Sequence, residues 1–172
     1  MTQDKNLPVK IGLALGTALG MVVISIGILR YKTGMILRND HTLSLVYWII
    51  FAVSIFFAVY RFRKIDALSF SLSQTIKIGI FAGLLSGALY TLYIVILNHY
   101  IVPDLSSRIV QYYEQELASN SAELSKGDLV DSMTVTKLNP AVRGLAYTLV
   151  CMAFGTAYAA LSTIALKRLR IS

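Results

Sequence analysis

The chain has 172 residues, of which 56% are hydrophobic and only 15% are charged, and it carries a formal net charge of +7. Soluble domains contain about 25% charged residues, so this chain has too few polar residues to cover an ordinary soluble fold. The basic residues gather beside long apolar segments, which indicates membrane topology and argues against a nucleic-acid-binding protein.

Four long runs of the chain contain no charged residue, and they cover residues 11–29, 42–60, 78–103 and 144–166. A helix needs about 20 apolar residues to cross the hydrocarbon core of a bilayer. We therefore predict an all-α fold, a bundle of four transmembrane helices that forms a single membrane domain over residues 1–172. The predicted spans are residues 9–29, 43–60, 75–102 and 141–168.

The first run is longer than the ~7–15-residue apolar core of a signal peptide, and no A-x-A-like site follows it, so we expect a retained anchor. The link at residues 61–77 alternates Leu or Phe with Ser. A strand there would leave unpaired edges, so we predict a short turn, with Ser73 or Thr75 as the N-cap of the third span. The only cysteine, Cys151, lies in the fourth run, so no intramolecular disulfide is expected.

The segment at residues 104–139 is the largest polar piece of the chain and holds six of the nine acidic residues. Asp104 is a candidate N-cap and Gly127 a candidate helix stop. Apolar residues repeat between them at intervals of three to five, which predicts an amphipathic helix on the surface of the bundle or of the membrane. Asn139 and Pro140 are expected to cap and start the fourth span. The apolar stripe consists of Leu105, Ile109, Tyr112 or Tyr113, and Leu117.

Basic clusters follow the second and fourth runs, as RFRK at residues 61–64 and KRLR at 167–170. Because basic residues near span ends favour the cytoplasm, we expect both termini to be cytoplasmic and the segment at 104–139 to be periplasmic. These residues either fix topology on anionic headgroups or also contact an anionic lipid, a lipid carrier or a protein partner. They are Arg61, Arg63, Lys64, Lys77, Lys167, Arg168 and Arg170.

The pattern Lys-Ile-Gly-x-x-x-Gly-x-x-x-Gly begins at Lys10 and again at Lys77, 67 positions later. Glycines four apart lie on one helix face and allow close approach of helices in a bilayer. We interpret them as packing between the first and third spans, with a homo-oligomer or partner seam as the alternative. The repeat also suggests two duplicated helical hairpins. The helix-packing residues are Gly12, Gly16, Gly20, Gly79, Gly83 and Gly87, with Gly155 on the fourth span.

Residues that carry chemistry are sparse. No charged residue lies in the middle of a span, which argues against a pump, and there is no metalloprotease, paired-cysteine or phosphate-loop motif. We therefore expect no enzymatic activity, no cofactor and no metal, although His41 and His99 could both lie at the outer interface. Tyr90, Tyr93 and Tyr158 lie deeper and serve either helix packing, with their hydroxyls bonded to neighbouring Ser or Thr residues, or ligand contact.

The stretch LSFSLSQTIKIGIFAGLLSGALYTLYIVILNHYIVPD resembles the central pattern of the domain-of-unknown-function 4199 family. The resemblance implies a small four-span inner-membrane protein of Bacteroidetes-type bacteria. It supplies no catalytic residues, and it implies a context similar to that of accessory proteins found beside polyprenyl-phosphate glycosyltransferases. The matching positions are Ser69, Phe70, Lys77, Gly79, Asn98, Pro103 and Asp104.

Two classes of function follow. The first is a non-enzymatic accessory or scaffolding subunit, whose partners are membrane lipids and another integral membrane protein, with a membrane glycosyltransferase as the candidate. The alternative is a small transporter or a lipid-carrier-binding protein. A transporter requires a wet polar cavity at mid-depth, whereas an accessory subunit is expected to have a dry core and an exposed apolar groove.

Overall fold

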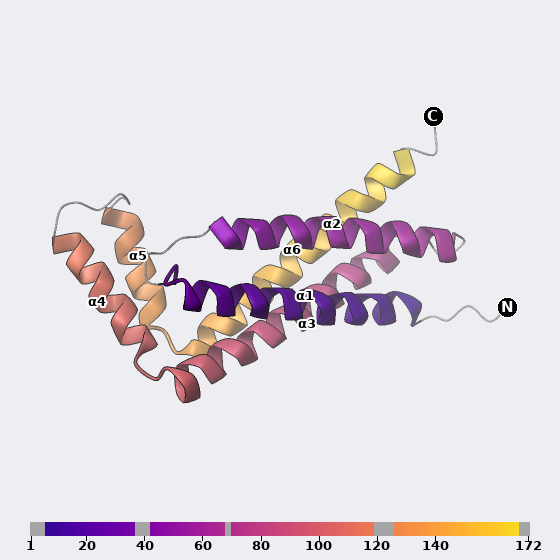
Figure 1. The fold of residues 1–172 in the computed structure, drawn as a ribbon. Coiled ribbons are helices and arrows are strands. Elements are labelled where there is room, and N and C mark those ends of the chain that lie inside the picture. Colours follow the sequence, from indigo (N-terminus) through magenta and orange to yellow (C-terminus); the bar gives the residue numbers. More distant parts are fainter. Residues whose placement is uncertain (1–5, 37–41, 68–69, 119–125, 169–172) are drawn as a thin grey trace.

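The computed structural model describes residues 6–36, 42–67, 70–118 and 126–168 (Figure 1). The described residues form six α-helices and one short π-helix, and they contain no strand. In chain order the elements are α1 (Leu7–Lys32), α2 (Thr42–Ile65), α3 (Leu72–Ile96), η1 (Leu97–Ile101), α4 (Leu105–Ala118), α5 (Lys126–Lys137) and α6 (Pro140–Arg168).

Four of these helical segments are long and apolar enough to cross a membrane: α1, α2, α3 continued by η1, and α6. Large apolar side chains point outward along them, including Met21, Ile49 and Leu161, each more than half exposed. Such a surface is stable against lipid and unstable against water. The chain is therefore a multi-pass membrane protein, and the predicted all-α fold with four spans is confirmed.

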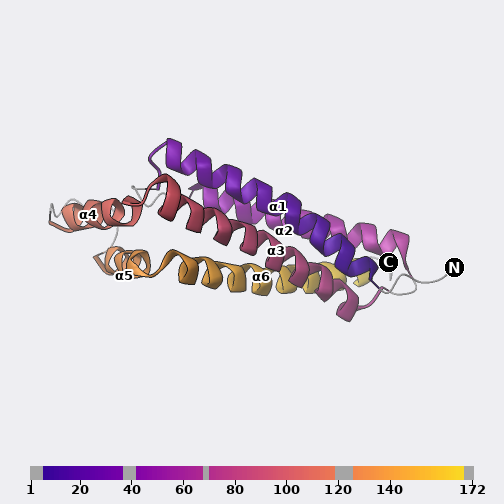
Figure 2. The ribbon, with the colours of Figure 1, turned by 90° about the horizontal axis from the view of Figure 1, so that it is seen from below.

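Helix α3 makes the most extensive contacts of the four spans, with α6 and α1 packed closely against it. Helix α2 packs more loosely on α1 and α6 and so completes a ring of four helices. Figures 1 and 2 show α4 and α5 together at one end of the bundle, while the Leu7 end of α1 and the Arg168 end of α6 lie at the other. These ends are called the α4–α5 end and the terminal end below.

The two glycine stripes have different partners. Gly12 and Gly16 of α1 face α3, where an added Cβ would lie 2.9 Å from the carbonyl oxygen of Ile78 and 2.8 Å from that of Ala82. The stripe on α3 faces α6 instead, and Gly79 there meets Gly155 backbone to backbone. The interpretation that both stripes belong to an interface between the first and third spans is therefore wrong for the α3 stripe, because α1 packs on a different face of α3, which carries Ile78, Phe81, Ala82 and Leu85.

Two hydroxyl pairs flank the glycine interface of α3 with α6. The Thr163 hydroxyl donates to that of Thr75 at 2.7 Å, and the hydroxyls of Thr91 and Thr148 are 3.1 Å apart. Interhelical hydrogen bonds of this kind contribute about 0.6 kcal/mol each in membrane proteins. Their effect is to fix the register in which the small residues of the two helices meet.

Large side chains of α2 fill the space that the small residues leave. Tyr47, Phe51, Ile55 and Val59 are almost completely buried and recur at every fourth position, so they lie on one face. They pack with Leu19 of α1 and with residues of α6. The bundle is thus asymmetric, with backbone-close packing around α3 and side-chain packing under α2, and these contacts give no support to the duplicated-hairpin hypothesis.

The polar segment differs from the single helix that the sequence predicts. Gly127 lies inside α5 and is not a helix stop. The apolar face of α4 carries Leu105, Ile109 and Tyr113, which pack on Leu97 of η1, so α4 covers the end of the bundle. Burial in this cluster raises the pKa of Tyr113 above its ordinary value.

The helix caps agree with the sequence at one position and differ at another. The side-chain oxygen of Asn139 accepts a hydrogen bond from the Ala141 amide at 2.9 Å, and α6 starts at Pro140. That prediction is confirmed. The N-cap of α3 is Ser71, whose hydroxyl accepts from the Gln74 amide at 3.4 Å, so the expectation of Ser73 or Thr75 was wrong. The Thr75 hydroxyl is instead turned into the interface with α6.

Candidate ligand site

A cavity of about 450 Å³ lies at the α4–α5 end of the bundle. It is bounded by side chains from all four spans and from η1, α4 and α5, so no pair of helices forms it alone. Its depth along α1 runs from Arg30 to Val23, which is about two turns or 10 Å. The described lining residues are Val23, Ile26, Gly27, Arg30, Ile36, Ser44, Tyr47, Trp48, Tyr90, Tyr93, Ile94, Leu97, Asn98, Leu105, Ile109, Val135, Arg143 and Tyr147.

One side of this cavity is aromatic. The rings of Tyr90 and Tyr147 lie 4.4 Å apart between centroids, and Tyr93 and Trp48 each lie 6.1 Å from one of them. These contacts join α2, α3 and α6. The Tyr93 hydroxyl is buried and has no hydrogen-bond partner among the described residues. Tyr90 and Tyr93 thus line a cavity, whereas Tyr158 packs in the core against Phe51.

The hydroxyl groups expected to serve these tyrosines have other partners. Ser86, Thr156 and Ser162 each donate to a carbonyl oxygen of their own helix. Thr91 does the same and also contacts Thr148. The prediction that they bond to tyrosine hydroxyls was therefore wrong, because a Ser or Thr side chain on a helix reaches the preceding turn more easily than a neighbouring helix.

Two arginines lie in the wall of the cavity. The Arg30 guanidinium donates to the Ser44 hydroxyl at 3.1 Å, and Arg143, which is half-buried, donates to the Ser106 hydroxyl at 3.3 Å. The Nε of Arg143 is buried without a hydrogen-bond partner among the described residues. No described lining residue carries a carboxylate. Because a partly buried cation such as Arg143 is costly without a counter-charge, this wall suits an anionic ligand.

A chain of hydrogen bonds holds Arg143. Arg143 donates to Ser106, the Ser106 hydroxyl donates to the side-chain oxygen of Asn98 at 2.9 Å, and the Asn98 amide nitrogen donates to the carbonyl of Ile94 at 2.9 Å. Asn98 stands in the π-helical turn η1, and such turns occur frequently at functional sites. These hydrogen bonds therefore connect the Arg143 guanidinium on α6 to α4 and to the end of α3.

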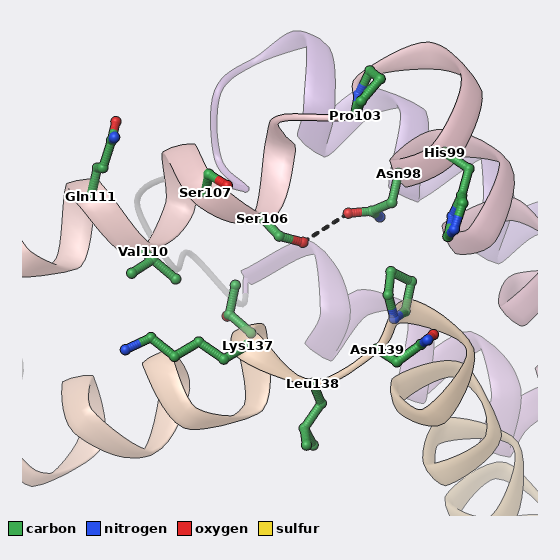
Figure 3. Close-up of a pocket in the computed structure, with 12 residues that line it drawn as sticks. Asn98, His99, Pro103, Ser106, Ser107, Val110, Gln111, Lys137, Leu138 and Asn139 are labelled. Carbon is green, nitrogen blue, oxygen red and sulfur yellow. Dashed lines mark hydrogen bonds between the residues drawn. The ribbon is translucent and has the colours of Figure 1, made fainter.

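A second, open cleft of about 720 Å³ lies on the other side of this hydrogen-bond chain (Figure 3). It separates α4 from the junction of α5 and α6, and Asn98 lines both the cleft and the cavity. Figure 3 shows Asn98 and Ser106 pointing toward each other. The other described lining residues are His99, Pro103, Ser107, Val110, Gln111, Thr136, Lys137, Leu138, Asn139 and Pro140.

His99 lines this cleft, while His41 lies outside the described residues. Within the described ranges, no group of three or more His, Cys, Asp or Glu side chains is placed to hold a metal ion. Cys151 is a buried free thiol in the packing interface of α6 with α3.

The basic residues singled out from the sequence lie at the terminal end, away from the cavity. Arg63 is half-buried, donates to the carbonyl of Leu166 at 2.6 Å and lies 5.9 Å from the ring centroid of Phe70. It thereby ties the end of α2 to that of α6. Lys77 is half-buried, and Arg170 lies outside the described residues. The exposed members of this basic end are Arg61, Lys64, Lys167 and Arg168.

Arg30 and Arg143 belong to no recognisable motif, so the cavity was not predicted from the sequence. One signal was available, because Arg143 precedes Tyr147 by four residues and therefore shares its helix face. Tyr90 and Tyr93, three apart, form a similar pair on α3. No sequence pattern indicates that these faces of α6 and α3 meet, because that depends on how the two helices cross.

The fold and the cavity define a class: a small multi-pass membrane protein with a cationic, aromatic cavity at one end of a four-helix bundle. The model of one family, described as "Protein of unknown function (DUF4199)", matches residues 12–166, which is almost the whole chain. The chain belongs to this family, and the resemblance noted from the sequence is confirmed. No curated protein and no solved structure matches the chain.

Proposed function

We propose that this protein binds the anionic headgroup of a membrane amphiphile in the cavity at the α4–α5 end and acts as a non-catalytic lipid-binding subunit. The observation that carries the proposal is the half-buried Arg143, which has a buried unsatisfied nitrogen and faces no described carboxylate in the cavity. A phosphate would supply the missing charge and acceptor oxygens.

The chemistry of the wall fits an amphiphile better than a small water-soluble anion. Val23 and Ile26 of α1 line the part that reaches into the bundle, together with the rings of Tyr47 and Tyr147, and the arginines lie toward the span ends. A volume of about 450 Å³ is within the range of ~300–1,000 Å³ that holds a small ligand. It accommodates a headgroup and the first part of a chain, and the rest of the lipid would lie along the helices.

Two observations favour binding over transport or catalysis. The cavity occupies one end of the bundle, whereas alternating access requires a site near the bilayer midplane. Its described titratable groups are two arginines, four tyrosines and no acid or histidine, which offers no general acid–base pair near neutral pH. The lipid-carrier-binding alternative is thus the function that the geometry supports best.

The proposal includes a location and a partner. Exposed basic residues at the terminal end, such as Arg61 and Arg168, support a cytoplasmic face there, with α4 and α5 in the periplasm of a bacterial inner membrane. A binder of phosphate-bearing lipids would present them to another membrane enzyme. A glycosyltransferase that uses polyprenyl phosphates has the matching chemistry.

The test is the charge of Arg143. Protein purified in mild detergent is titrated with phosphatidylglycerol or phosphatidylcholine, and bound lipid is counted by native mass spectrometry. Arg143→Gln is expected to weaken phosphatidylglycerol binding about tenfold or more, since a charge-assisted hydrogen bond contributes about 1.5–3 kcal/mol. The matched control is Arg108→Gln, an exposed arginine on α4 that lines neither cavity.

Equal binding of phosphatidylglycerol by wild type and Arg143→Gln would refute the proposal. The partner is tested separately, by mass spectrometry of proteins that co-purify with the tagged chain from its native membrane. A glycosyltransferase among them supports the accessory role, and its absence from a preparation that retains bound lipid contradicts that part alone.

A further inference from the structure

We propose that the open cleft between α4 and the α5–α6 junction binds a polyhydroxylated headgroup that is joined to the anionic lipid in the cavity. The inference rests on the proposed lipid-binding function and specifies its ligand class. The expected ligand is a lipid whose phosphate carries a sugar or another polyol.

The cavity and the cleft are adjacent and share a wall. The partition between cavity and cleft consists of the side chains of Arg143, Ser106 and Asn98, joined by hydrogen bonds of 3.3 and 2.9 Å. Asn98 lines both spaces, and Ser106 lines the cleft. The Arg143 guanidinium therefore reaches the boundary. A phosphate bound to it would lie where its second substituent can enter the cleft.

The side chains of the cleft suit a polyhydroxylated group. Its described side chains include the amides of Gln111 and Asn139 and the hydroxyls of Ser107 and Thr136, in addition to Asn98 and Ser106. Amides and hydroxyls both donate and accept hydrogen bonds, which is what a ring of hydroxyl groups requires. The described lining holds no carboxylate to repel an adjacent phosphate and no aromatic ring other than that of His99.

The position of the cleft relative to the cavity also fits this ligand. Most of the residues that line the cleft belong to α4, α5 and the link between α5 and α6, which lie at one end of the bundle (Figure 1), and the cleft residues His99, Ser107 and Gln111 are exposed. The deep part of the cavity is lined by apolar and aromatic side chains, and the cleft wall carries amide and hydroxyl groups beside apolar surface. The order along the bundle is thus apolar, cationic and then hydrogen-bonding, which is the order of chain, phosphate and polyol in a glycosylated or inositol-bearing phospholipid.

The test compares two lipids of equal charge, phosphatidylinositol and phosphatidylglycerol, titrated into the purified full chain and counted by native mass spectrometry. We expect wild type to bind phosphatidylinositol at least about fivefold more tightly, since a few added hydrogen bonds contribute that much or more. The double variant His99→Ala/Ser107→Ala should lose this preference and keep its affinity for phosphatidylglycerol. Gln115→Ala, an exposed change on α4 outside the cleft, should keep both.

Each of the following results would contradict one part of the proposal. Equal binding of the two lipids by wild type, with phosphatidylglycerol binding still dependent on Arg143, would overturn the polyol site and leave the lipid-binding function intact. A preference that survives in the double variant would place the headgroup elsewhere. Full competition by an equal concentration of soluble inositol 1-phosphate would show that the ligand is not lipid-borne.

Discussion

Replacing Gly83 by alanine should lower the free energy of unfolding by about 2–3 kcal/mol, because the added Cβ would overlap backbone atoms of α6. A Cβ at Gly83 would lie 2.6 Å from the carbonyl carbon of Cys151 and 2.7 Å from the Cα of Met152. Both are backbone atoms of α6, so no side-chain rotation relieves the overlap. Because carbon atoms pack at about 3.5–4.0 Å, α6 must move away from α3 by roughly 1 Å.

The same displacement would break the flanking hydrogen bonds. The pairs Thr75–Thr163 and Thr91–Thr148, now at 2.7 and 3.1 Å, would exceed the limit of about 3.5 Å for a hydrogen bond. Their loss contributes about 1 kcal/mol together, and the weakened packing of a long interface contributes the rest. Gly83→Leu should be more severe.

Reversible unfolding in mixed micelles, followed by circular dichroism and by the fluorescence of the single tryptophan, Trp48, measures this loss. Ala88→Leu is the matched control, because Ala88 is on the same helix and exposed. Gly34→Leu is a second control: Gly34 has φ of +71° and no neighbour within 4 Å, so its cost is the left-handed backbone alone, about 1–2 kcal/mol. An unchanged unfolding midpoint for Gly83→Ala would show that α3 and α6 do not pack through this glycine.

Two further predictions concern the hydroxyl pairs and the topology. Thr163→Val should lower stability by about 0.6 kcal/mol in the same unfolding assay, whereas Thr17→Val, which removes an exposed hydroxyl bonded within α1, should change it little; equal losses would mean that the interhelical pair is not special. In a Cys151→Ser background, a cysteine at Gln115 should react with a membrane-impermeant maleimide in intact spheroplasts and one at Ser73 should not, and the reverse labelling would invert the proposed orientation.

Much of the candidate site could not be predicted from the sequence, because it forms where faces of two different helices meet. Arg143 and Tyr147 occupy one helix face, and so do Tyr90 and Tyr93, but nothing in either spacing indicates that the two faces meet. The convergence follows from the close approach of α6 to α3 through Gly144, where an added Cβ would overlap the Thr91 side chain. The basic clusters were conspicuous in the sequence, yet Arg63 serves to hold α2 to α6.

The sequence by itself determined the elements of this protein. Uncharged runs of about 20 residues must cross a membrane as helices because no other open structure satisfies their backbone there, and Asn139 with Pro140 sets the start of α6. The partners of each helix were decided only by the tertiary structure. In lipid no hydrophobic force selects them, so the choice depends on complementary surfaces of two helices at once. For that reason the glycine stripe of α3 packs against Gly155 of α6, and the cavity exists only where seven elements come together.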